Sequence, residues 1–149
     1  MNTLENIKAT GQLKITLTAP DGTIKHEQIE KNLVVSTGLA FIASRMKDTT
    51  ATAMSHMAIG TGSTAPAAGN TTLGSESARV ALTSTTVTAN AIAYQATFPA
   101  GTPASLTAIT EAGIFNANSG GTLLCRTVFA AVNKDVNDTL SITWTVTIS

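Results

Sequence analysis

Residues 140–148 alternate strictly between large apolar and hydroxyl-bearing side chains. The apolar members are Leu140, Ile142, Trp144, Val146 and Ile148, and the polar members are Ser141, Thr143, Thr145 and Thr147. Successive side chains of a β-strand point to opposite faces. This period of two therefore predicts a strand with one face in a core and the other face polar.

Shorter segments of the same character occur along the chain. Residues 13–18 and 23–31 predict a hairpin around Pro20, Asp21 and Gly22, which are typical turn residues. Further strands are predicted at 54–59, 77–88, 91–98, 108–115 and 122–129, so that about eight strands are expected in all. Asn90 and residues 116–121 supply turns, and residues 60–70 and 97–107 form loops. This pattern predicts a mainly β fold, an antiparallel β-sandwich that is jelly-roll-like.

One short α-helix is predicted at residues 36–47. Ser36 or Thr37 can cap its N-terminus, and Lys47 lies in the last turn, where a cation suits the helix dipole. Its apolar face at helical spacing consists of Leu39, Ile42, Ala43 and Met46. We expect this helix to pack across one face or one end of the β-structure.

The 149 residues suffice for one domain. We expect residues 1–11 to be a flexible N-terminal arm, because they show no period, and residues 12–149 to be a single β-sandwich domain with the helix. The start lacks the apolar region of a signal peptide, and no run of about 18 apolar residues predicts a transmembrane helix. The single cysteine, Cys125, cannot form an internal disulfide. We therefore expect the chain to fold in a cytoplasm.

Charged residues make up 12% of the chain, which is about half the usual share. Thr, Ala, Ser and Asn largely replace them, and the net charge is zero. A weakly charged surface is poor at keeping copies apart, which favours a surface covered by partners; the alternative is a soluble domain with a neutral polar face. Neutrality and an aromatic share of 4% also give no reason to expect binding to nucleic acid or membrane.

The sequence offers few residues for catalysis or metal binding. His26 and His56 lie thirty residues apart, too few ligands for a structural zinc, although His56 on a trimer axis could hold an ion. Cys125 lies in an apolar strand, which favours a buried, inert thiol. The segment Gly60-Thr61-Gly62 lacks the Lys–Ser/Thr pair of a phosphate loop, so these glycines indicate a tight turn or a close backbone approach.

We therefore expect no enzyme, no catalytic residues, no cofactor and no metal. No Gly-x-Ser-x-Gly elbow is present. The sequons at Asn70 and Asn137 are chance matches in a chain without a secretory signal.

Four charged residues lie close to apolar strand positions: Glu76, Arg79, Glu111 and Arg126. A buried charge must be paired, so an Arg79–Glu111 or an Arg126–Glu111 bridge would tie neighbouring strands together. Alternatively, these residues face solvent at strand edges and discourage wrong strand pairing. The sequence does not separate the two alternatives.

Two groups of short segments carry a family resemblance. The first is His56-Met57-Ala58-Ile59-Gly60-Thr61-Gly62, then Ala65-Pro66, Thr72-Leu73-Gly74-Ser75-Glu76 and Arg79-Val80. The second is Thr110-Glu111-Ala112-Gly113-Ile114-Phe115-Asn116, then Gly121-Thr122-Leu123-Leu124. Their order and spacing resemble the N-terminal attachment region of tailed-phage tail-collar fibre proteins, and also short free-standing phage virion proteins. The resemblance covers about residues 32–129.

Tail-collar fibre proteins continue into a shaft and a receptor-binding tip, whereas this sequence stops at Ser149. The resemblance thus implies a docking module: a capsid decoration (cement) protein that binds the shell, or alternatively a tail, collar or fibre-attachment adaptor. Expected partners are other copies of the chain, as a trimer or dimer, and phage capsid or tail proteins. The protein would lie in the virion after assembly in the bacterial host cytoplasm. A glycan-binding module is a third hypothesis, which the scarcity of aromatic residues disfavours.

Overall fold

A computed structural model describes residues 7–47 and 51–149. These residues form nine β-strands and one α-helix. In chain order the elements are β1 (Ala9–Thr18), β2 (Ile24–Val34), α1 (Ser36–Arg45), β3 (His56–Gly60), β4 (Glu76–Ala81), β5 (Ser84–Thr88), β6 (Ala91–Phe98), β7 (Thr107–Phe115), β8 (Leu123–Lys134) and β9 (Thr139–Ile148). The predicted mainly β fold with one helix is confirmed.

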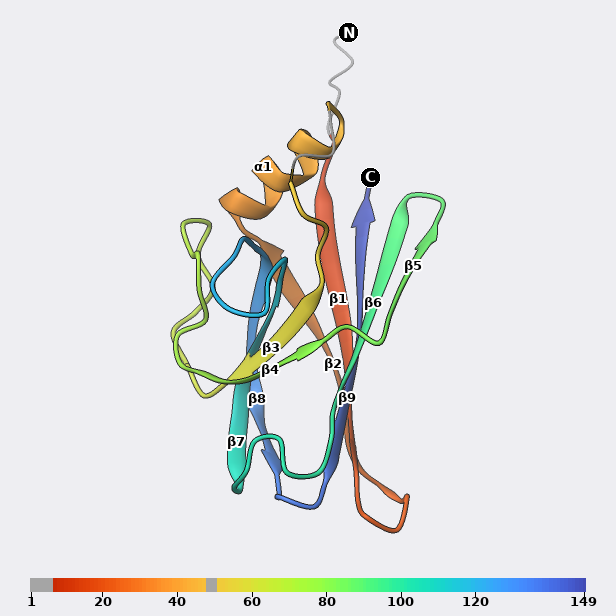
Figure 1. Ribbon diagram of the computed structural model, residues 1–149, viewed down its shortest axis with the longest axis vertical. Helices are drawn as coiled ribbons and strands as arrows, with labels where there is room; N and C mark the ends of the chain where they lie inside the picture. Colours follow the sequence, from red (N-terminus) through yellow and green to blue (C-terminus); the bar gives the residue numbers. More distant parts are fainter. Residues whose placement is uncertain (1–6, 48–50) are drawn as a thin grey trace, which may run out of the picture.

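The strands form one antiparallel sheet in the order β4-β3-β7-β8-β2-β1-β9-β6-β5. The sheet curls so that β3, β4, β7 and β8 form one layer and β1, β9, β6 and β5 the other (Figure 1). Strand β2 joins the layers, because it pairs with β1 along most of its length and with β8 at Leu33 and Val34. The sandwich-like layering is thus confirmed, but the layers are halves of a single sheet, whereas a jelly roll has two separate sheets.

The core lies between the two halves and follows the predicted alternation of β9. Leu140, Ile142, Trp144 and Val146 are buried, while the residues between them are partly exposed. Strand β1 pairs with β9 and adds Leu13, Ile15 and Leu17 to the same interior. Each fully buried side chain of this size stabilises the fold by about 1.5–3 kcal/mol. These two strands therefore anchor the β-structure.

The predicted strand at 77–88 is in fact two strands at opposite edges of the sheet. The chain leaves β4 after Ala81 and changes neighbours: the N–H of Leu82 donates to the carbonyl of Ser55, and the N–H of Thr83 donates to the carbonyl of Gln95. The sequence carries a sign of this break. Val80 and Leu82 share one phase of the alternation, whereas Val87 has the opposite phase.

The helix is shorter than predicted and buries a different face. It ends at Arg45, so Lys47 lies beyond it, and Val35 occupies the N-cap position without a side-chain cap bond. Thr37 instead donates its hydroxyl to the carbonyl of Leu123 in β8. The predicted apolar face is wrong: Leu39, Ala43 and Met46 are exposed, and only Ile42 packs on the core.

The helix faces β8 through its smallest residue. Gly38 is the buried residue of α1, and the nearest atoms beside it are the backbone of Leu124. Phe41 and Ile42 then contact the core from the end of the sheet. Close backbone contact and a few aromatic and aliphatic contacts dock this helix, so a simple count of apolar residues misplaces its buried side.

Two predicted turns are confirmed. At the β1–β2 turn, Gly22 has a φ of 89° and Asp21 Oδ1 accepts hydrogen bonds from the backbone N–H and the hydroxyl of Thr23. The hydroxyl bond is the main cause that lowers the pKa of Asp21 below its usual value. At the β7–β8 turn, Asn116 Oδ1 accepts from the N–H of Thr122.

The N-terminal boundary needs correction. Ala9 to Gly11, expected in the flexible arm, belong to β1 and pair with β9, and Gly11 also pairs with β2. Lys8 and Ser149 exchange backbone hydrogen bonds just before this strand. Residues 1–6 of the predicted arm lie outside the described residues. Within the described part of the chain, no helix is both long and apolar enough to cross a membrane.

Candidate functional site

Glu111 lies in the middle of β7, and its side chain is completely buried. Its Oε2 atom accepts hydrogen bonds from the backbone N–H of Gly74 at 3.1 Å and from Arg126 Nη2 at 3.3 Å. Its Oε1 atom accepts from the backbone N–H of Ser75 at 3.2 Å. A carboxylate removed from water needs such partners. The predicted Arg126–Glu111 bridge is therefore confirmed, and it joins β7 to β8.

Arg126 extends this arrangement to Asn70, inside the loop that precedes β4. Its Nη1 atom donates to Asn70 Oδ1 at 3.0 Å, and the same Asn70 oxygen accepts from the backbone N–H of Ala67 at 2.8 Å. Asn70, noticed in the sequence only as a chance sequon, is thus a structural residue. We call Glu111, Arg126 and Asn70, together with the backbone of Gly74 and Ser75, the Glu111 network.

The glycines of the Gly60-Thr61-Gly62 segment make room for this network. A Cβ atom on Gly62 would overlap Glu111 Oε2, and one on Gly74 would lie 3.0 Å from the same oxygen. A Cβ atom on Gly60 would overlap the carbonyl of Ser75. The close-approach interpretation of these glycines is confirmed, because only glycine lets the backbone come this near to the carboxylate.

Arg79 does not reach Glu111, so the alternative Arg79–Glu111 bridge is wrong. It pairs with Glu76 on its own strand, at 2.7 Å between Nη2 and Oε1. Its Nη1 atom donates to the carbonyls of Ala117 and Gly120, and its guanidinium carbon lies 3.8 Å from the centre of the Phe115 ring. Arg79 therefore fixes the β7–β8 turn against β4.

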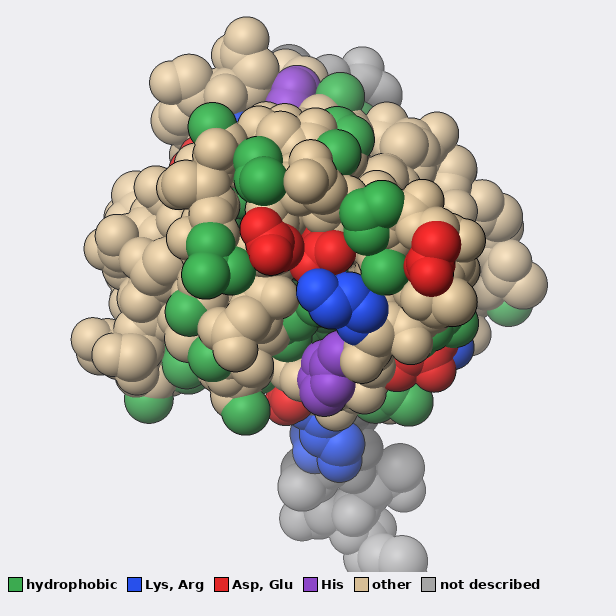
Figure 2. All heavy atoms as spheres, turned by 90° about the horizontal axis from the view of Figure 1, so that it is seen from below, with side chains coloured by type: hydrophobic (Ala, Val, Ile, Leu, Met, Phe, Trp, Pro, Cys, Tyr) green, Lys and Arg blue, Asp and Glu red, His purple; other side chains and the backbone are tan. Residues whose placement is uncertain are grey.

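A second group of charges occupies the end of the molecule opposite the helix. Figure 2 shows acidic and basic side chains and a histidine together near the middle of this face, with apolar side chains scattered around them. Lys25 Nζ lies 2.8 Å from Asp138 Oδ2, and this hydrogen bond is the main cause that lowers the pKa of Asp138. Buried Lys134 donates to the carbonyl of Pro99 at 3.1 Å, and burial lowers its pKa.

These charged residues were not predicted from the sequence as part of a site, although the alternation in β8 indicated that Lys134 is buried. Lys134 follows the buried Val132 by two residues, so it shares the inward phase of β8. The side chains of this face bind one another and the backbone. The arrangement is that of a closed end of the sheet, where buried charges are satisfied within the chain.

The candidate catalytic and metal-binding residues are not brought together. His26 on β2 contacts Gln28, and His56 on β3 contacts Ser55. Burial raises the pKa of the Cys125 thiol well above its usual value, so a reactive thiolate is disfavoured. Among the described residues, no group of three or more His, Cys, Asp or Glu side chains could hold a metal ion.

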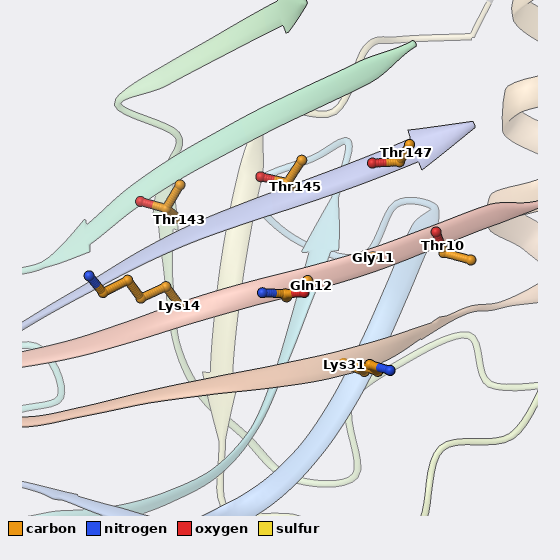
Figure 3. A pocket seen from close by; sticks show the side chains of 8 residues that line it. All are labelled: Thr10, Gly11, Gln12, Lys14, Lys31, Thr143, Thr145 and Thr147. Atoms are coloured by element: carbon orange, nitrogen blue, oxygen red, sulfur yellow. The ribbon is translucent and has the colours of Figure 1, made fainter. Parts of the chain in front are cut away.

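A polar groove of about 680 Å³ runs along the outer face of β1, β2 and β9. It is lined by Thr10, Gly11, Gln12, Lys14, Lys31, Thr143, Thr145 and Thr147. Figure 3 shows the threonines of β9 beside the side chains of β1 on one face of the sheet. Hydroxyls and two ammonium groups offer hydrogen bonds to a polar surface.

An apolar hollow of about 330 Å³ lies on the other side of the sheet, at the helix end. Its lining includes Phe41 and Arg45 of α1, Thr85 and Val87 of β5, and Tyr94 of β6. Burial is the main cause that raises the pKa of Tyr94 to about 12.

The aromatic side chains are turned inward. Five of the six are buried, namely Tyr94, Phe98, Phe115, Phe129 and Trp144, and Phe41 is partly buried. The Trp144 indole N–H donates to Asn32 Oδ1 at 3.0 Å, so even its polar edge is satisfied inside the fold.

No family model, curated protein or solved structure matches the chain.

Proposed function

We propose that the protein is a structural protein of a tailed-phage particle, namely a capsid decoration protein that binds the shell and stabilises the particle. The observation that carries this proposal is where the resembling segments lie. They form β3, much of β4, the C-terminal part of β7 and the start of β8, and β3 pairs with both β4 and β7. Glu111 of the second segment binds the backbone of Gly74 and Ser75 in the first.

The resemblance thus falls on one contiguous part of the fold whose residues depend on one another. A shared docking module, built on the Glu111 network, accounts for their order and spacing. In such a module the network would serve to hold the loop of residues 61–75 in one shape.

The surface supports a role in assembly. The groove side of the sheet presents threonines with two lysines, and all five residues of the edge strand β5 are exposed and uncharged. A weakly charged surface of this kind opposes contact with a neighbouring protein less than a highly charged surface does. The partners would be the shell proteins and other copies of the chain.

A reconstitution experiment tests the proposal. Phage particles that lack this protein are mixed with the purified chain, and both the bound amount and the temperature of genome release are measured. The proposal predicts saturable binding in hundreds of copies per particle and a higher release temperature. Particles that bind none of the chain, at concentrations that would fill a specific site, would contradict it.

A tail, collar or fibre-attachment adaptor is the second candidate, because the resembled region attaches fibres. A dozen or fewer bound copies, with no change in the release temperature, would favour this role. A glycan-binding role is disfavoured, since sugar sites commonly use exposed aromatic rings and those of this chain are turned inward. A glycan array is expected to give no hits.

In this role the N-terminal arm would order against a neighbouring protein, and deletion of residues 1–6 only tests this idea. Deletion further into the chain would remove Ala9 and Thr10, which pair with β9. If the arm orders against a neighbouring protein, the shortened chain should bind particles more weakly while its unfolding temperature stays unchanged. Equal binding by both chains would show that the arm has no such role.

A further inference from the structure

Strand β5 is an edge of the sheet that lacks the usual protection. All of its residues are exposed, and Val87 is 68% exposed. Its pairing with β6 is regular, without a bulge, and it contains neither proline nor charge. Edge strands in monomeric proteins are normally shielded by charged side chains, prolines, bulges or a covering segment, because unpaired N–H and C=O groups can otherwise bind another strand.

The opposite edge of the same sheet, β4, provides an internal comparison. It carries the exposed Glu76, and its pairing with β3 is irregular between Ile59 and Gly60. Both features discourage the addition of a further strand. By contrast, residues 80–110, which include β5 and β6, contain no charged residue at all. The two edges of the sheet therefore differ in their protection against pairing with a further strand.

From this difference we infer that β5 pairs with β5 of a second copy of the chain, antiparallel and about a two-fold axis at Thr86. In such an isologous contact each residue meets a residue of the same strand, so any charge near the axis would meet its own copy. An uncharged strand fits this arrangement. Two identical edges that pair in this way give a dimer, because each copy then has its β5 edge occupied.

The side chains of β5 suit this register. Thr86 would lie opposite Thr86 of the second copy, and Thr85 opposite Val87. Threonine pairs and threonine–valine pairs stabilise antiparallel strands. Thr85 and Val87 both line the apolar hollow, so they share one face of the sheet. The exposed Val87 of the second copy would thus be placed beside this hollow and be partly buried there.

The contact is small, because five residues a side bury less than a standard interface does. A weak dimer that forms as the concentration rises is therefore expected. The inference does not depend on the phage role, because it concerns the chain alone. On the surface of a particle, however, high local concentration would favour the same pairing between neighbouring copies.

Sedimentation of the full chain over a concentration series tests the pairing. The wild type should pass from monomer to dimer. Thr86→Lys places two ammonium groups opposite each other at the axis and should raise the dissociation constant at least about tenfold. Ser77→Lys, the same type of change on the exposed part of β4, is the matched control and should leave it unchanged. Fluorescence of the single Trp144 reports whether each variant is folded.

A cysteine variant tests the register directly. Thr86→Cys should form a disulfide between copies under mild oxidation, because opposed residues of antiparallel strands lie about 4.5–5.5 Å apart between Cα atoms, within disulfide range. Ser77→Cys should not, and the native Cys125 is buried. Three outcomes would overturn the inference: a chain that stays monomeric up to millimolar concentration, a dimer that Thr86→Lys leaves intact, or a folded Thr86→Lys variant that loses particle binding although the wild type is monomeric. The last outcome would assign β5 to a strand of a different protein.

Discussion

At the scale of single residues, Glu111 joins β7 to β8 and to the loop before β4. Its carboxylate is held by one guanidinium and two backbone N–H groups, and glycine at positions 62 and 74 leaves it the necessary space. The sequence offered the bridge to Arg126 as one of two possible pairings of Glu111, beside the alternative that these charges face solvent. The two backbone donors could not be anticipated, because the sequence does not show which backbone N–H groups come close to Glu111 in the fold.

Glu111→Gln should destabilise the fold by about 3–5 kcal/mol, because it leaves Arg126 as a buried charge without its counter-ion. Urea unfolding followed by Trp144 fluorescence measures this change. Glu27→Gln is the matched control: its pair with Lys14 is exposed and 3.6 Å long, so a loss of less than about 1 kcal/mol is expected. Equal losses for the two variants would show that the Glu111 network does not hold the fold together.

Tyr94 is the only tyrosine, so the ultraviolet absorbance of tyrosinate reports on this residue alone. Burial is the main cause that raises its pKa to about 12, and the folded chain should therefore titrate near that value. The unfolded chain in urea should titrate near the ordinary value of about 10. A midpoint near 10 in the folded chain would place the ring in water and contradict the described core.

The sign of the related stability effect follows from this shift. The folded state holds the phenol proton more tightly than the unfolded state, so the contribution of Tyr94 is complete below about pH 10 and is lost as the pH rises toward 12. In Tyr94→Phe, the free energy of unfolding should fall less over this interval than in the wild type. Urea unfolding at several alkaline pH values measures the difference.

At the scale of elements, local pattern predicted the strands better than the helix. Strands β6, β7 and β9 follow the predicted segments closely, because alternation is a local property of the chain. The helix docks through a glycine and through bonds to β8, which depend on residues some eighty positions away. The split of residues 77–88 into β4 and β5 likewise depends on distant neighbours, Ser55 and Gln95.

Gly38→Ala tests whether contact or helix propensity decides the stability of α1. Alanine is the better helix former by about 1 kcal/mol. A Cβ atom at this position would overlap the Leu124 carbonyl, so we expect a net loss of about 1–3 kcal/mol. Gly69→Ala is the control: nothing lies within 4 Å of its Cβ position, so it should be neutral or slightly stabilising. A gain in thermal stability for Gly38→Ala would show that the helix does not lie against β8 as described.

At the scale of the whole molecule, the fold is a curled sheet with one protected edge and one unprotected edge. Composition indicated a surface with little charge, but only the strand order shows that β5, which carries no charge, forms an edge of the sheet. The order of nine strands could not be predicted, because each strand's neighbour is chosen by long-range pairing that the local pattern does not encode.

An averaged electron-microscopy image of the native particle tests the central proposal most directly, with the chain located by a bound antibody fragment. A decoration protein predicts density for hundreds of copies spread over the head, arranged at symmetry axes of the shell. A dozen or fewer copies at the neck or tail would replace decoration by the adaptor role. Particles without any density or label for this chain would contradict a structural role in the virion altogether.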